Sequence, residues 1–141
     1  MVSAFAAGGP VMAPRGAVDY VPGVCNIGPA EIARRRLAGH VGLAIGLVVL
    51  AVLVATGAPP WARLILILPI AAAASGYLQA RLRFCAGFGS RGIFNFGELG
   101  NTEDVIDPIA LAADRARARA IMLASLAIGV VVAVAAFLLP V

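Results

Sequence analysis

The chain contains no lysine, one histidine and two cysteines, and only 13% of its 141 residues are charged. Soluble domains carry about a quarter charged residues, so the composition argues against an ordinary soluble domain. The histidine and the cysteines form neither a CxxC nor an HxxxH spacing, which excludes the common zinc signatures. A Ser/His/Asp set, a P-loop and a paired-carboxylate pocket are also missing, so the sequence gives no positive sign of an enzyme.

The chain is instead rich in apolar residues, which make up 62% of the sequence. They concentrate in three segments, Val41–Gly57, Ala62–Leu78 and Ile121–Leu139. As a helix, about 20 apolar residues cross the ~30 Å hydrocarbon core of a bilayer. The sequence therefore predicts an all-α integral membrane protein with three transmembrane helices. A soluble all-α domain with a dense core is the competing fold.

We expect a single domain, because 141 residues fit one domain of ordinary size. Residues 1–22, interrupted by glycines and prolines, are expected to form a flexible tail, and residues 23–141 a three-helix membrane domain. The transmembrane helices are expected at about 38–57, 61–79 and 119–139. The short connection between the first two makes them an antiparallel hairpin, to which the third helix is added.

Local patterns predict helix starts and ion pairs. Gly28-Pro29 suits the N-cap and first position of a helix, and Asp107-Pro108 suits the start of another. The pairs Glu31–Arg35 and Asp114–Arg117 have the helical spacing at which opposite charges meet. The loop 79–118 is expected to contain juxtamembrane helices.

Arginines flank the apolar segments mainly on one side. The group comprises Arg34, Arg35, Arg36, Arg81, Arg83, Arg91, Arg115, Arg117 and Arg119, and only Arg63 falls on the other side. Under the positive-inside rule, the N-terminus and the loop 79–118 are cytoplasmic and the C-terminus lies outside. The prediction is thus a multi-pass protein of the bacterial inner (plasma) membrane.

The same arginines are expected to attract anionic lipids of the bilayer. The sequence pI of about 10.0 could also suggest nucleic acid. However, the arginines sit at helix ends and not on a soluble face with interleaved aromatic residues, so nucleic acid is not expected as a partner.

Small residues at four-residue spacing predict close helix packing. The candidates for such contacts are Gly42, Gly46, Gly76, Ser125 and Gly129. Their spacing supports helix packing in general and leaves open whether the contacts lie within one chain or between chains.

The two cysteines and the histidine are the candidates for chemistry. Cys85 lies among arginines, and Cys25 lies just ahead of a helix N-terminus, and both settings favour a thiolate. The predicted topology puts both thiols on the cytoplasmic side, where they could be a redox, sulfur-carrying or metal-binding pair. The alternative is that they simply pack as small apolar residues. His40 is a weak third metal ligand, and an interfacial histidine without metal is favoured.

The segment Gly87–Gly92 has GxGxxG spacing. A dinucleotide site requires this spacing between a strand and a helix, and here a membrane helix is expected before it. We interpret the match as coincidental, and no cofactor is expected.

A short pattern resembles a known family. It consists of Asn26-Ile27-Gly28, Glu31, Arg35 and Gly39, then two short spans, then Phe84-Cys85. This resembles the small two-helix membrane domain of the inner-membrane rhodanese family, over about residues 25–87. Ala86 stands where that family has proline, and the third span lies outside the pattern. The resemblance implies a sulfur-handling neighbourhood and helix-mediated dimerisation, with Cys85 at the family's thiol position.

Two functions follow from these observations. The leading hypothesis is a small non-catalytic bacterial membrane protein that acts as an accessory subunit, anchor or scaffold, in a homo-oligomer or a larger membrane complex. The alternative is a cytoplasm-facing thiol, sulfur-handling or redox protein that uses Cys85 and Cys25.

Overall fold

The computed structural model describes residues 20–141, so the expected tail lies outside the described residues up to residue 19. In chain order the elements are α1 (Pro29–Ala55), the 3₁₀ helix η1 (Pro60–Leu66), α2 (Ile67–Leu82), α3 (Ala86–Arg91), β1 (Ile93–Phe94), β2 (Glu103–Asp104) and α4 (Pro108–Leu138). Tyr20–Pro22, assigned above to the tail, are part of the folded structure, because the Tyr20 ring stacks on Phe94 at 4.7 Å between ring centroids.

Three helices are long and apolar enough to cross a membrane, as the sequence predicts: α1, η1 with α2, and α4. Many of their large apolar side chains point outward, for example Leu68 at 71% exposure and Val131 at 68%. A soluble protein would bury such side chains, whereas a bilayer covers them. The three apolar helices thus indicate a multi-pass membrane protein.

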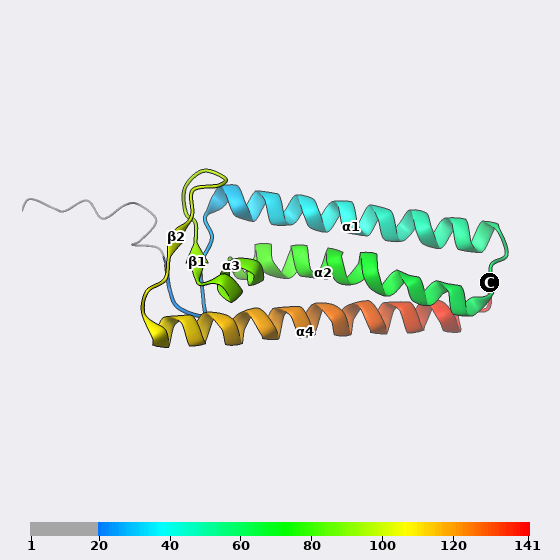
Figure 1. Ribbon diagram of the computed structural model, residues 1–141. Coiled ribbons are helices and arrows are strands. Elements are labelled where there is room, and N and C mark those ends of the chain that lie inside the picture. Colours follow the sequence, from blue (N-terminus) through cyan, green and yellow to red (C-terminus); the bar gives the residue numbers. More distant parts are fainter. Residues whose placement is uncertain (1–19) are drawn as a thin grey trace, which may run out of the picture.

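The helices form a single layer with α2 in the middle (Figure 1). The turn after α1 makes α1 and α2 an antiparallel hairpin, as expected, and α4 packs on the other side of α2. At one end of this layer the connecting segments are short, and at the other end they fold into a small compact unit.

The small residues predicted for helix packing are used within the chain. A Cβ added to Gly42 would lie 2.8 Å from the backbone nitrogen of Ala73, and one added to Gly76 would lie 2.5 Å from that of Gly39. A Cβ on Gly129 would lie 2.8 Å from the carbonyl oxygen of Ile67. Backbone atoms cannot give way cheaply at such distances, so glycine permits both close helix contacts of α2. Gly46 contacts α2 as well, through the side chain of Ile70, and the buried Ser125 donates back to the carbonyl oxygen of Ile121 in α4.

Helix starts follow the sequence signals. α1 begins at Pro29 after the N-cap Gly28. α4 begins at Pro108, and the side chain of its N-cap Asp107 accepts hydrogen bonds from two backbone N–H groups of the first turn. The Asp107 side chain satisfies donors that the start of α4 leaves without intrahelical partners, whereas Pro29 at the first position of α1 has no N–H to satisfy.

The expected all-α fold needs one correction. β1 and β2 pair antiparallel, with Ile93 opposite Asp104 and Phe94 opposite Glu103. Strands of two residues are too short to show the alternating pattern by which a strand is recognised in a sequence. The short helix α3 lies in the same loop, where juxtamembrane helices were expected.

The opposite end of the layer is closed by Arg63, which the sequence places only as a flanking charge. Its side chain is 2% exposed. Its guanidinium group donates to the carbonyl oxygens of Ala136 at 3.0 Å and Leu139 at 2.8 Å, and also to that of Val141. The last carbonyls of a helix have no intrahelical donor, so Arg63 from η1 caps the end of α4.

Candidate functional site

α1 and α4 begin and α2 ends at the same end of the layer (Figure 1). Here the segments 20–28 and 83–107 form what we call the cap, which includes α3, β1 and β2. The cap and the adjoining helix turns bury Asn26, Glu31, Gln79, Asn95 and Asp114. Buried polar groups are costly unless they are hydrogen-bonded, so each one requires an account.

Asn26 joins the first segment of the cap to the end of α2. Its amide oxygen accepts from the backbone N–H of Cys85 at 2.6 Å, and its amide nitrogen donates to the Cys85 carbonyl at 3.1 Å. Its own backbone N–H donates to the carbonyl oxygen of Arg83 at 3.1 Å. One side chain thus fixes the turn that leaves α2.

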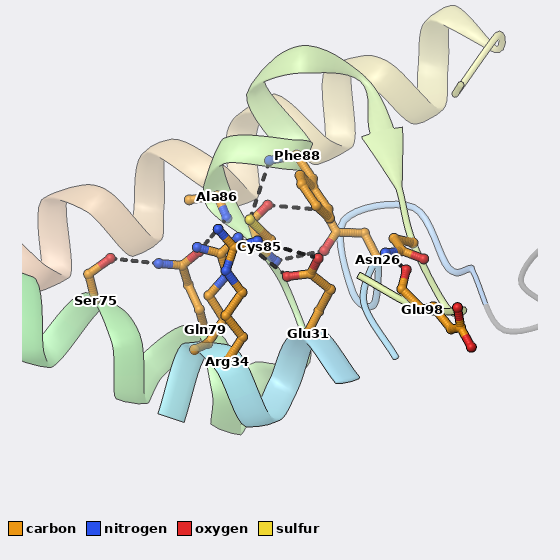
Figure 2. A network of polar contacts seen from close by, with 11 residues as sticks. Asn26, Glu31, Arg34, Ser75, Gln79, Cys85, Ala86, Phe88 and Glu98 are labelled. Atoms are coloured by element: carbon orange, nitrogen blue, oxygen red, sulfur yellow. Dashed lines mark hydrogen bonds and ion pairs between the residues drawn. The ribbon is translucent and has the colours of Figure 1, made fainter. Parts of the chain in front are cut away.

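Gln79 supports the same turn from within α2. Its side-chain oxygen accepts from the backbone N–H of Ala86 at 2.9 Å, and its nitrogen donates to Ser75 Oγ at 2.7 Å. Asn26 and Gln79 therefore converge on the turn at Cys85 from two different segments (Figure 2).

Asn95 joins the segment after β1 to the first segment of the cap. Its backbone N–H donates to the Asn26 carbonyl at 3.0 Å, and its carbonyl accepts from Gly28 at 2.8 Å. Its side chain donates to the carbonyl of Glu98 at 2.8 Å and accepts from the N–H of Gly97 at 2.9 Å. The sequence analysis did not single out Gln79 or Asn95, although each is a lone amide in an apolar or aromatic stretch.

Glu31 forms the predicted ion pair with Arg35. The closest oxygen–nitrogen distances are 3.6 Å to Arg35 and 3.9 Å to Arg34, and the Glu31 side chain is 1% exposed. Among the described residues, neither carboxylate oxygen has a hydrogen-bond partner. Arg35 also lies 5.8 Å from the centroid of the Phe88 ring, a cation–π contact that ties α1 to α3.

The predicted Asp114–Arg117 pair is wrong. Asp114 is fully buried, and its carboxylate accepts from the Tyr20 hydroxyl at 2.6 Å and from the backbone N–H of Gly23 at 2.7 Å. These bonds attach the start of the described chain to α4. Burial and the hydrogen bond to Asp114 raise the pKa of Tyr20 well above its ordinary value of 10.0.

The two cysteines have different surroundings. Cys85 is 1% exposed and is the N-cap of α3, where its sulfur accepts from the backbone N–H of Phe88 at 3.5 Å. Cys25 is partly exposed, and its sulfur lies 3.9 Å from the carbonyl oxygen of Ile27. Both are thiols and not members of a disulfide. Their segments are neighbours through Asn26, but only Cys25 is open to its surroundings.

Cys25 lines an open pocket of about 560 Å³ at the start of α1. We call it the basic pocket, because its lining includes Arg36 and Arg83. The full lining is Cys25, Ile27, Gly28, Pro29, Ile32, Ala33, Arg36, Arg83 and Phe96. Arg83, expected to activate Cys85, thus faces the pocket of the other thiol. Arg83 is also the one non-glycine residue among 20–141 with a positive φ, at 53°.

The structure does not assemble the weak metal candidates. Within residues 20–141, no group of three or more His, Cys, Asp or Glu side chains is placed to hold a metal ion. His40 is instead within 2.7 Å of the Tyr77 hydroxyl through its Nδ1. The GxGxxG match of Gly87–Gly92 falls in α3 and its C-cap, directly after α2 and without a preceding strand.

The remaining arginines of the topology set lie at the cap end. Arg81, Arg91, Arg115 and Arg119 are exposed there, and Arg117 is partly buried with its Nε unpartnered among the described residues.

No family model, curated protein or solved structure matches the chain. The arrangement itself offers two chemical capacities. The hydrogen bonds of Asn26, Gln79 and Asn95 serve to fix backbone, and the basic pocket has two arginines and the partly exposed Cys25 in its lining.

Proposed function

We propose that the chain is a small non-catalytic membrane protein, an accessory subunit or scaffold that holds the cap at the cytoplasmic face of the bacterial inner membrane. One observation carries this proposal: the amide side chains buried in and beside the cap hold its main-chain groups in place. Asn26 bonds both main-chain groups of Cys85, and Gln79 accepts from the N–H of Ala86. Asn95 bonds main-chain groups of Gly97 and Glu98 in its own loop. A catalytic group must reach a substrate, whereas these groups make a fixed platform.

The orientation is part of the proposal. The arginine-rich end of the layer is the cap end, and the positive-inside rule assigns it to the cytoplasm. A membrane-impermeant maleimide should therefore fail to label Cys25 in intact cells and should label it in inverted vesicles. Cys85 should stay unlabelled on both sides until the protein is unfolded, because it is buried. Labelling of Cys25 from outside would overturn the orientation.

The proposal also requires a partner, either a second copy or a larger membrane complex. The small-residue rows are occupied within the chain, so an interface would use the outward apolar faces of the helices. Size-exclusion chromatography with light scattering in mild detergent should show an oligomer or a co-purifying protein. A monodisperse monomer without any companion would contradict an accessory role.

A second function is favoured by the position of Cys25. The resemblance to the inner-membrane rhodanese family suggests sulfur handling, and we propose Cys25 as the thiol that could perform it, since Cys25 opens into the basic pocket. Its thiolate would attack a sulfane sulfur of inorganic polysulfide, forming a persulfide and releasing a polysulfide one sulfur shorter. Intact-mass spectrometry would show one added sulfur in the native protein and in Cys85→Ser, and none in Cys25→Ser. An unmodified native protein would contradict this function.

A further inference from the structure

The basic pocket lies at a definite depth along α1. The 27 residues of α1 rise ~1.5 Å each, which gives a rod of ~40 Å. The hydrocarbon core takes about 20 of these residues. Counting back from Ala55, at the opposite end, puts the core boundary close to Arg36. The turns of α1 that line the pocket therefore fall in the head-group layer.

The lining of the pocket is suited to an anion with an apolar neighbour. Arg36 and Arg83 contribute two positive charges, and the lining contains no carboxylate among the described residues. The first turn of α1 adds the positive end of a helix dipole, and Gly28 provides no side-chain cap for its N–H groups. Ile32 and Phe96 supply an apolar wall.

Beyond the pocket, the same face of α1 carries the exposed His40 and then apolar side chains of the span. Pro29, Ile32, Ala33 and Arg36 follow the spacing i, i+3, i+4, i+7, which places them on one face of α1. The same face carries Leu43 and Leu47 in the span. Both are exposed, Leu47 at 59%. A ligand with a charged head and a hydrocarbon tail would meet positive charge in the pocket and, beyond His40, apolar side chains along the span.

We propose that the basic pocket binds the phosphate-bearing head group of one acidic phospholipid, with its acyl chain along Leu43 and Leu47. Arg36 and Arg83 pair with the phosphate from two helices, so the bound lipid links α1 to the end of α2. Arg83 lines this site in a left-handed backbone conformation, which costs energy for a non-glycine residue. The inference rests on the proposed membrane placement.

Cys25 gives a native reporter of occupancy, because it lines the pocket while Cys85 is buried. The full chain in neutral detergent micelles would be treated with maleimide in the presence of phosphatidylglycerol, phosphatidylcholine or inorganic phosphate. Phosphatidylglycerol should slow the labelling of Cys25 and the other two should not. Equal protection by phosphatidylcholine would overturn a preference for acidic lipid. Equal protection by inorganic phosphate would reassign the pocket to free anions and overturn the lipid.

Matched variants test the arginines. In native mass spectrometry, Arg36→Gln/Arg83→Gln should bind phosphatidylglycerol about 30-fold more weakly, because each basic residue near an acidic lipid contributes about fivefold. Arg81→Gln/Arg119→Gln removes the same charge from exposed arginines outside the pocket and should retain binding. Arg36→Lys/Arg83→Lys should recover most of it, which a merely misfolded glutamine variant would not explain. Equal losses in the two glutamine pairs would refute a defined site.

Failure of the lipid site and failure of the scaffold proposal can be separated. Detergent dependence and oligomeric state are measured on the unaltered protein without added lipid. If the protein is membrane-extracted and oligomeric but all lipids give equal labelling of Cys25, only the lipid site is wrong.

Discussion

The most direct test of the cap is removal of the Asn26 side chain. Asn26→Ala deletes the acceptor for the Cys85 N–H and one donor to the Cys85 carbonyl. The carbonyl keeps a second donor, the N–H of Gly89 at 2.9 Å, whereas the N–H is left buried without a partner. An orphaned buried donor costs about 1–3 kcal/mol and a lost hydrogen bond about 1 kcal/mol. The cap should therefore lose about 2–4 kcal/mol.

The assay uses the buried thiol of Cys85 as its reporter. With Cys25→Ser as background, Cys85 is the remaining thiol, and maleimide can reach it only when the cap opens. A loss of 2 kcal/mol raises the open population, and thus the labelling rate, about 30-fold. Far-UV circular dichroism in the same micelles should show retained helix content, because the hydrogen bonds of the long helices are untouched.

Asn101→Ala is the matched control. Asn101 is an exposed asparagine of the same loop, and within residues 20–141 its one hydrogen bond comes from its backbone N–H. Its replacement should leave the labelling rate of Cys85 unchanged. If Asn26→Ala and Asn101→Ala label at the same rate, the bidentate contact does not hold the cap, and the platform argument fails.

Three further predictions concern other contacts. Arg63→Leu removes the side-chain donor of the Leu139 carbonyl and one of two donors of the Ala136 carbonyl, which keeps the backbone N–H of Leu139, and should cost about 1–3 kcal/mol in detergent unfolding. Arg63→Lys should recover part of this loss, and a silent Arg63→Leu would contradict the capping role. Gly76→Ala forces a Cβ into the α1 backbone and should lower the melting temperature. Gly87→Ala is the control and should not lower it, because its added Cβ would lie 3.7 Å from its nearest neighbour, the sulfur of Cys85. Equal melting temperatures of the two variants would argue against tight α1–α2 packing. Because the pKa of Tyr20 is raised on folding, the hydroxyl's contribution to the free energy of unfolding is complete below pH 10 and falls as the pH rises beyond it. The stability difference between the native protein and Tyr20→Phe should therefore shrink above that pH. A constant difference in pH-dependent unfolding would refute the linkage.

The long helices could be predicted because their cause is local and repeated. Hydropathy over some twenty residues identifies each span, and proline after a glycine or aspartate N-cap marks the starts of α1 and α4. The Glu31–Arg35 pair follows from helical spacing alone. Each of these predictions requires nothing beyond neighbours along the chain.

The cap could not be predicted because its contacts join distant parts of the sequence. Asn26 and Cys85 are 59 positions apart, and Tyr20 and Asp114 are 94 apart. No periodic pattern connects such residues, and a single sequence offers no signal that pairs them. The prediction for Asp114 was wrong for this reason: helical spacing favoured Arg117, but a hydroxyl and a backbone N–H from a remote segment occupy the carboxylate.

Polar residues at both ends of the layer serve the same physical need. Backbone N–H and C=O groups beyond the end of a membrane helix must find hydrogen-bond partners inside the protein. Arg63 provides donors for the end of α4, and Asn26, Gln79 and Asn95 provide partners for the segments of the cap. Since this need alone accounts for those side chains, none of them requires a catalytic explanation.

Cys25, Arg36 and Arg83 are different, because closing the helix ends gives no reason for two guanidinium groups and a thiol to share an open pocket. A stable fold could use many other residues at these three positions. A phosphate would instead require the arginines, and a sulfur substrate would require the cysteine. The basic pocket is therefore where a ligand should be sought, and the buried Cys85 belongs with the structural residues of the cap.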